Sequence, residues 1–516
     1  MSVEVEWIKS AISLSLERGK EKEEQKTEGF LKLEKEYLAF DQSRRDAIRT
    51  ILYTQFEAHD IIYVLSNFVQ YMNIYEFKED IFEKIMDSDI DCYQKSMLEL
   101  QLRVVVKGFY EKRRRFHDKN VEDFGCELTF ASKHSYCPVE KRNRKRIVIV
   151  TSQILGDNHS PTQVVLHTTY VLQQCLGYEV LLFVCPPDAG IKPELWYYPV
   201  HMRSQELFRN FSMRVEFRDT FFDGYQINMQ KGCQKEYDMM LEIIHAWNPW
   251  FVLDMGSCNP VIDLTNHFTT LVSMGMSIEC PVTEADILLR FEKLSESVEM
   301  EYQKVFEKTG QKQIFLEGTM PILMGETDEK CDRKELNLPE DDFLIVIVGN
   351  RLDEEISDEF VQILRAIVEN EENVSFVFIG RGEKFLNRLS DDVFKNRIFF
   401  LGYCNKLMAT YAPLNLYLNP KRMGGGYSAA YALAAGLPVV TLPECDVENM
   451  VGEHFVVQNY DEMIETVRKY LHDENFYKIQ KKYAEEKASC NSVEKLTEYV
   501  SEMLQKIADV MEEKEE

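Results

Sequence analysis

From Asp41 to about Arg115, apolar residues recur mostly every three or four positions, which places them on one face of successive helices. The clearest series is Ile48, Leu52, Phe56, Ile62, Leu65 and Phe68. No proline precedes Pro138. The pattern predicts an all-helical N-terminal domain over residues 1–140. Its first 30 residues are rich in Glu and Lys and are expected to form a loose helix or a frayed end.

At Arg146 the pattern changes to short, continuous apolar runs separated by helical segments. The predicted strands are Ile147–Val150, Val180–Cys185 and Phe251–Asp254, and the predicted helices are Gln163–Leu176 and Glu236–Trp247. Strands that are apolar at every position are buried on both faces, as in a parallel sheet covered by helices. The pattern therefore predicts a Rossmann-like domain over residues 147–316.

The same alternation restarts after a proline-containing, acidic connection at residues 317–342. Its predicted strands are Phe343–Val348, Val374–Ile379, Ile398–Leu401, Leu414–Leu418 and Pro438–Thr441. They predict a second Rossmann-like domain over residues 341–490, followed by a C-terminal helix within 491–516. The predicted fold class is α/β, with two doubly wound domains facing a cleft. Such sheets bind ligands at the carboxyl ends of their strands.

Composition narrows the class of protein. Apolar residues make up 45% and charged residues 28% of the chain, which is typical of a globular protein. The formal charge of −27 argues against nucleic-acid binding, because that needs a basic surface. The 12 cysteines lack metal or redox spacing, and no signal peptide is evident, so we expect reduced thiols and a cytoplasmic location. No apolar run approaches the ~20 residues of a membrane span.

A basic stretch separates the helical domain from the first sheet. It contains Arg113–Arg115, Lys141, Arg142 and Arg144–Arg146. One interpretation is a patch for an acidic partner, and the other is a solvated linker. The linker interpretation is favoured.

The strongest chemical signal is Asn-Pro-Lys-Arg-Met-Gly-Gly-Gly-Tyr-Ser at residues 419–428, between a predicted strand and an alanine-rich helix. Consecutive glycines allow the backbone to approach a ligand and present amide N–H groups, and the helix start adds a positive dipole. This pattern predicts a diphosphate site, whereas the alternative is a structural turn. The candidate ligand-binding residues are Lys421, Arg422, Gly424, Gly425, Gly426, Tyr427 and Ser428. For the last two, helix capping is the alternative role.

Other candidates follow the predicted strands of the second sheet. Asn350 and Arg351 follow the first strand and Arg381 the second. Arg351 is expected to bind the phosphates, and the alternative is a surface pair with Asp353 or Glu354. Tyr403 follows the third strand, beside Gly402, where it is expected to meet a nucleobase or to pack as a core aromatic.

In the first sheet, His159 follows the first strand and is the candidate catalytic residue. An imidazole there could orient a substrate or move a proton, and its alternative role is to cap a helix. Asp157 is a weaker candidate base, since Asp-Asn favours turns. Asp89-Ile90-Asp91 matches the metal-binding motif Asp-x-Asp, but it lies between predicted helices and is rejected as a metal site. No metal is expected, because cations and a helix dipole can neutralise a leaving diphosphate.

Residues 376–440 resemble the donor-binding domain of GT-B glycosyltransferases of group 1. The similarity lies in Phe376–Gly382, Phe399–Tyr403 and the run from Asn419 to Val440. Many retaining members carry two Glu residues here, at positions occupied by Met423 and Tyr431. Residues 151–162, with the helical domain, are also similar to bacterial cytoplasmic protein glucosyltransferases.

The resemblance implies a glycosyltransferase that uses a nucleotide-sugar, a UDP-sugar, without a metal or another cofactor. It also implies a protein or peptide acceptor, and a partner subunit or a second copy of the chain is an open possibility. The missing acids motivate an alternative, a non-catalytic partner or chaperone subunit of a protein-glycosylating complex. Another nucleotide-sugar enzyme of this fold, such as a 2-epimerase, is the third interpretation.

Overall fold

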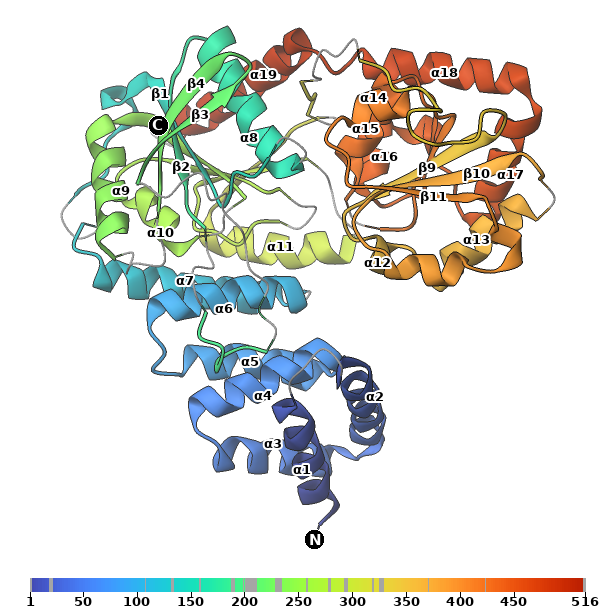
Figure 1. Cartoon of the computed structure of the whole chain (residues 1–516). Helices are drawn as coiled ribbons and strands as arrows, with labels where there is room; N and C mark the ends of the chain where they lie inside the picture. The colour runs from blue at the N-terminus through green and yellow to red at the C-terminus, as the bar shows by residue number, and fades with distance from the viewer. Residues whose placement is uncertain are drawn as a thin grey trace. The chain divides into compact units, whose positions relative to one another are not determined.

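The computed structural model divides the chain into two compact units (Figure 1). The first unit is Met1–Leu316 with Met503–Glu516, and the second is Glu317–Glu502. The residues described are 2–17, 22–106, 108–130, 134–156, 159–186, 191–197, 199, 211–227, 234–256, 259–276, 280–291, 296–317, 320–323, 329–369, 371–422 and 424–513.

The N-terminal region is helical, as its sequence predicts. Its helices are α1 (Val3–Leu16), α2 (Glu23–Ala39), α3 (Gln42–Gln55), α4 (Ala58–Tyr71), α5 (Tyr75–Met86), α6 (Cys92–Val105) and α7 (Tyr110–Glu127). The expectation of a frayed start is wrong, because α1 buries Trp7, Ile8 and Ala11 in the core. The Asp91 carboxylate caps α6 by accepting a hydrogen bond from the Gln94 N–H at 2.8 Å.

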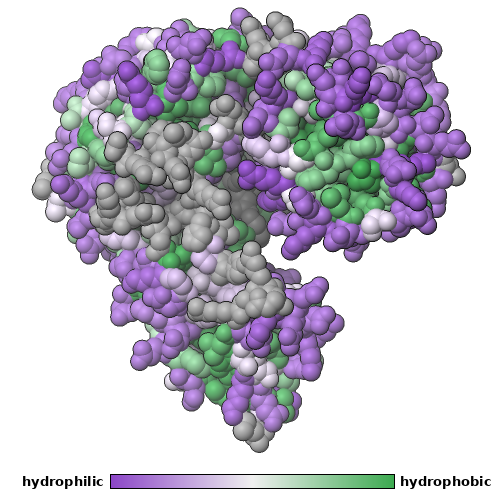
Figure 2. Space-filling view, viewed as in Figure 1, coloured by the Kyte–Doolittle hydropathy of each residue, from purple (hydrophilic) through white to green (hydrophobic). Residues whose placement is uncertain are grey.

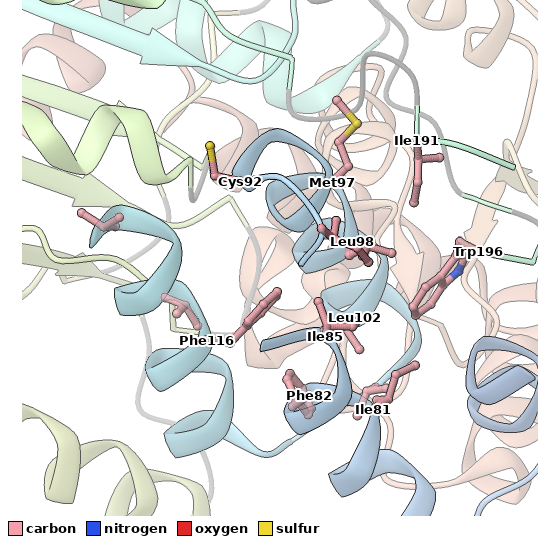
Figure 3. Close-up of a cluster of buried hydrophobic side chains, with 14 of the residues drawn as sticks. Ile81, Phe82, Ile85, Cys92, Met97, Leu98, Leu102, Phe116, Ile191 and Trp196 are labelled. Atoms are coloured by element: carbon pink, nitrogen blue, oxygen red, sulfur yellow. The ribbon is translucent and has the colours of Figure 1, made fainter. Parts of the chain in front are cut away.

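Residues 191–197, which follow strand β2 (Glu179–Val184), pack against the helical region. Figure 3 shows Trp196 directed toward Leu98 and Leu102, on the same side of the cluster as Ile191. Trp196 is only 1% exposed. The Tyr197 N–H donates to the Ser66 hydroxyl at 2.9 Å. The helices and the first sheet therefore share one hydrophobic core.

A buried charge cluster also joins α6 and α7 to the short helix α10 (Pro260–Asp263). The ring of His117 is fully buried, with Nδ1 2.6 Å from Glu99 of α6 and Nε2 bonded to the Asp263 carboxylate. Asp263 also accepts from the Thr283 hydroxyl at 2.6 Å and from the Glu284 N–H at 2.8 Å. Burial alone would lower the pKa of His117, but the charges of Glu99 and Asp263 hold it well above its usual value. Burial and the neighbouring charges of Asp263 and Asp118 raise the pKa of Glu284 to about 7.

The first sheet has the strand order β3-β4-β2-β1-β5-β6-β7-β8. All neighbouring strands are parallel except β3 and β4. Its elements are β1 (Asn143–Thr151), α8 (Ser160–Tyr170), a π-helix (Val171–Cys175), β2 (Glu179–Val184), β3 (Ser212–Phe217), β4 (Thr220–Gln226), α9 (Gln234–Trp247), β5 (Pro249–Met255), α10 (Pro260–Asp263), a 3₁₀ helix (Leu264–His267), β6 (Leu271–Met274), β7 (Ile287–Arg290), α11 (Glu296–Thr309) and β8 (Lys312–Phe315).

The basic stretch is not a solvated linker, contrary to the favoured interpretation. Its first three arginines lie in α7, where Arg114 is buried and donates to Asp118 and Gln311, both at 2.5 Å. Arg142 is buried at the start of the sheet and donates to the carbonyl oxygens of Cys137 and Trp250. These cations satisfy polar groups of the fold itself.

The second unit holds a parallel sheet with the order β11-β10-β9-β12-β13. Its elements are β9 (Phe343–Gly349), α12 (Leu352–Glu355), α13 (Asp358–Val368), β10 (Val374–Gly380), 3₁₀ helices (Lys384–Leu389 and Asp392–Phe394), β11 (Ile398–Gly402), α14 (Leu407–Tyr411), β12 (Leu416–Leu418), α15 (Gly426–Ala434), β13 (Val439–Val440), α16 (Asp446–Val451), a 3₁₀ helix (Glu453–Phe455), α17 (Tyr460–His472) and α18 (Glu474–Ala488).

Helices cover both faces of this second sheet, which is the doubly wound arrangement that the apolar strands predict. Along β9, Ile345 and Ile347 pack in the core that contains α13 and α17. Leu344 and Val346, which alternate with them, pack in the core that contains α15. The predicted α/β fold class is confirmed in both units.

The last helix, α19 (Val493–Glu513), begins in the second unit, and its residues from Met503 onward belong to the first. Among the described helices, none combines the length and the apolar character that crossing a membrane requires. Figure 2 shows hydrophilic residues over most of the visible surface, with smaller apolar areas between them.

Candidate functional site at the carboxyl edge of the second sheet

The predicted ligand-binding residues of the second unit follow four neighbouring parallel strands. Asn350 and Arg351 come after β9, Arg381 after β10, Tyr403 after β11 and Lys421 after β12. Because the strands are parallel, their carboxyl ends meet at one edge of the sheet. The structure therefore gathers these side chains at the edge where this type of sheet binds ligands.

Backbone hydrogen bonds continue past the ends of β9 and β10 at this edge. The Arg381 N–H donates to the Gly349 carbonyl at 3.0 Å, and the Leu352 N–H donates to the Arg381 carbonyl at 3.1 Å. Gly380 has a φ of +135°, and a Cβ there would overlap the Gly349 carbonyl oxygen. Glycine at this position thus fixes where Arg351 and Arg381 leave the sheet.

The glycine-rich segment forms a left-handed bend before α15. Gly424 has a φ of +94° and Gly425 a φ of +92°. No side chain caps α15, whose N-cap is Gly425. Amide groups at such a bend can bind an anion. Burial raises the pKa of Asp446, at the start of α16, and the nearby Gly424 amide and Arg422 oppose that rise.

Arg422 lies beneath this bend rather than on its surface. Its side chain is 4% exposed and forms an ion pair with Glu355 at 2.5 Å. Nε donates to Asn419 Oδ1 at 2.9 Å, and Nη2 donates to the Tyr417 hydroxyl at 3.1 Å. A Cβ on Gly425 would come within 2.6 Å of Arg422 Nη2, so the glycine makes room for the guanidinium.

The other cations of this edge are exposed. Arg351 is 59% exposed and is paired at 3.3 Å with Glu355, not with the predicted Asp353 or Glu354. Lys421 is exposed, and the exposed Arg381 places its guanidinium 4.7 Å from the centre of the Tyr403 ring. These side chains supply positive charge and a partly exposed aromatic ring at the edge of the sheet.

The first residues of α15 have structural partners. The Ser428 hydroxyl donates to the Gly425 carbonyl at 2.8 Å and lies 2.8 Å from the Tyr417 hydroxyl. Tyr427 packs against Ile322, Ala430 and Met450. Tyr431 packs against the core that contains α15, where the family resemblance would place an acid. Met423 lies outside the described residues, so its position stays a sequence-based expectation.

In the first unit, His159 caps α8. Its Nδ1 accepts from the Thr162 N–H at 3.3 Å and lies 2.8 Å from the Thr162 hydroxyl, and burial lowers the pKa of the ring. The capping role is therefore present, and a catalytic role stays a prediction. Asp157 lies outside the described residues. Within the described ranges, no group of three or more His, Cys, Asp or Glu side chains is placed to hold a metal.

Sequence reasoning missed three polar residues of the site: Glu355, Tyr417 and Asp446. The spacing of four between Arg351 and Glu355 on a short helix is a signal that could have revealed their pair. Tyr417 and Asp446 carry no comparable signal. They reach the bend only because β12 and α16 pack beside α15.

Residues 328–487 match the family of glycosyl transferases group 1. Among curated protein sequences, none matches the chain significantly. The two α/β sheets have the architecture of the GT-B fold, and this match relates the second unit to glycosyltransferases. Over residues 328–487, which are less than half of the chain, the second unit is similar to glycosyl transferases group 1.

Three solved structures are similar to the chain, and the first of them, with a TM-score above 0.5, supports the fold. A mutant of the O-GlcNAc transferase from Thermobaculum terrenum is 13% identical and has a TM-score of 0.53, with 99% of this chain and 98% of that chain covered. Anabaena HepE in complex with UDP is 12% identical and has a TM-score of 0.46, over 70% of this chain and all (100%) of that one. The E. coli trehalose-6-phosphate protein bound to UDP-2-fluoro glucose is 10% identical, with a TM-score of 0.47 and coverage of 71% and 99%.

Proposed function

We propose that the protein transfers a sugar from a nucleotide-sugar, a UDP-sugar, to an acceptor. The observation that carries this proposal is the edge of the second sheet, where Arg351, Arg381 and Lys421 lie on loops beside a left-handed glycine bend within a group 1 domain. In this proposal the amides of Gly424–Gly426 and the start of α15 bind the diphosphate. Arg351 and Lys421 neutralise it, and no metal takes part. Tyr403 stacks on the base, with Arg381 behind its ring.

In the same proposal, the acceptor binds the first unit near His159, at the carboxyl end of β1. A protein or peptide acceptor is supported by the similarity of residues 151–162, together with the helical region, to protein glucosyltransferases. Burial lowers the pKa of His159, which favours the neutral form of the ring. Since Nδ1 accepts from the Thr162 N–H, the neutral ring carries its proton on Nε2.

Calorimetry with UDP tests the donor site. We expect the wild-type protein to bind UDP and the double variant Arg351→Ala, Lys421→Ala to lose at least about 100-fold in affinity, since each charged contact contributes roughly 1.5–3 kcal/mol. Lys478→Ala with Lys482→Ala on α18 is the matched control, because it removes the same charge from side chains that are 67% and 77% exposed elsewhere in the unit. Equal affinity of the two double variants would refute the assignment of the donor site.

Asp446 should weaken UDP binding, because its carboxylate lies near the Gly424 amide and repels a diphosphate. We expect Asp446→Asn to bind UDP about three to ten times more tightly, a modest electrostatic gain at a partly solvated site. Asn retains an oxygen that can accept from Gly424, so the bend should keep its shape. Affinity for uridine, which lacks the phosphates, should not change; a parallel gain for uridine would point to a change in the pocket instead.

A second function, a non-catalytic partner in a protein-glycosylating complex, is favoured by two observations. Tyr431 packs in the core instead of presenting an acid to the site, and the charge of Arg422 is already matched by Glu355. Incubation with labelled UDP-sugars separates the two functions. Release of UDP with a labelled protein or peptide supports the transferase, whereas binding without turnover supports the partner. Conversion of the sugar without an acceptor would indicate an epimerase.

A further inference from the structure

The buried groups beneath the glycine bend form one directed chain of hydrogen bonds. Arg422 Nη1 donates to Glu355 at 2.5 Å, and Nη2 donates to the Tyr417 hydroxyl at 3.1 Å. Because the Ser428 hydroxyl donates to the Gly425 carbonyl, the Tyr417 hydroxyl must donate to Ser428. We name Glu355, Arg422, Tyr417, Ser428 and the Gly425 carbonyl the Arg422 relay. It joins α12, β12 and the bend.

Within the Arg422 relay, the Arg422 side chain is too buried to contact a ligand. Its guanidinium is 4% exposed and its partner Glu355 is 9% exposed, so the pair is desolvated and its charges cancel locally. Breaking such a pair to bind a phosphate would leave a buried carboxylate without its cation. The exposed Arg351, held by the other oxygen of Glu355, has no such constraint.

We infer that Arg422 is a positioning residue for the diphosphate subsite, not a ligand of it. Through Tyr417 and Ser428, Arg422 fixes the bend that presents the amides. Glu355 balances the charge of Arg422 and holds Arg351 beside the bend. This inference rests on the proposed function for the identity of the ligand. It changes the role that the sequence alone predicts for Arg422. It also explains why the charge of Glu355 is placed in a site for anions.

The experiment compares variants that break the relay in different ways. Tyr417→Phe removes only the hydroxyl that connects Arg422 to Ser428. Arg422→Lys keeps the positive charge but removes the planar guanidinium, whose three nitrogens donate to three different partners. Tyr477→Phe is the matched control, since its hydroxyl donates to the Asn415 carbonyl at 3.1 Å, before β12 begins. The readouts are hydrogen exchange of the peptide that contains Gly424–Ser428, measured without ligand, and the Kd for UDP.

Both relay variants should exchange the amides of the bend faster and bind UDP about tenfold more weakly, because loosened site geometry weakens recognition. Tyr477→Phe should change neither. Unchanged exchange in Tyr417→Phe, or full UDP affinity in Arg422→Lys, would overturn the inference. If the wild-type protein binds no UDP but the exchange response is present, the proposed function fails and the positioning of the bend by the relay is upheld.

Discussion

Gly380→Ala is expected to destabilise the second unit by at least about 3 kcal/mol, because two unfavourable effects coincide. The backbone of Gly380 has a φ of +135°, which residues with a Cβ rarely adopt. A Cβ would also overlap the Gly349 carbonyl oxygen, which belongs to the neighbouring strand and cannot swing away as a side chain would. Relief requires β9 and β10 to separate at the edge that carries Arg351 and Arg381.

Urea unfolding can measure this effect in one unit at a time. All four tryptophans of the chain lie at positions 7, 196, 247 and 250, so their fluorescence reports the first unit. Far-ultraviolet circular dichroism reports both units. Gly380→Ala should shift the dichroism transition to lower urea and leave the tryptophan transition in place.

Gly436→Ala is the matched control. Its φ of +74° is also left-handed, but the nearest atoms to a new Cβ are the flexible ends of Glu485 and Lys481, each at 3.7 Å. The expected loss is only about 1–2 kcal/mol, the conformational cost alone. If the two variants lost the same stability, close approach of β9 and β10 would not be the reason for glycine at position 380.

Much of the fold follows from the sequence because buried parallel strands are apolar at every position. The predicted Phe343–Val348 and Val374–Ile379 each fall within one residue of β9 and β10. The segment Leu414–Leu418 is shorter as a strand, since the Leu414 N–H turns back to the Tyr411 carbonyl and β12 spans only Leu416–Leu418. Local pattern thus finds strands well and misjudges where turns interrupt them.

The site is predictable in its position but not in the direction of its side chains. The loops after β9, β10, β11 and β12 must meet at one edge once the sheet is parallel, so the candidates there could be chosen from the sequence. The burial of Arg422 could not be, because its partner Glu355 lies 67 residues earlier. Adjacent Lys421 and Arg422 look alike as charges, and only tertiary packing separates the exposed one from the buried one.

The second large effect is expected from His117→Ala, which should destabilise the first unit by about 3–5 kcal/mol. The substitution leaves the carboxylates of Glu99 and Asp263 buried without the imidazolium that both contact. It therefore weakens the junction of α6 and α7 with α10. Tryptophan fluorescence in urea measures the loss. His59→Ala is the control, because the exposed His59–Asp89 pair, at 3.5 Å, should contribute less than about 1 kcal/mol.

The pH dependence of the stability lost in His117→Ala shows whether the charge on His117 causes the loss. The folded pKa of His117 lies well above the unfolded value of 6.5, so the folded protein binds this proton more tightly. The stability that the proton adds is complete below pH 6.5 and is lost as the pH rises through the folded pKa. Measurements from pH 7.5 to 10 avoid the titration of Glu284, whose pKa is about 7. The difference between wild type and His117→Ala should shrink over that range; a constant difference would mean that the cavity, rather than the charge, determines the loss.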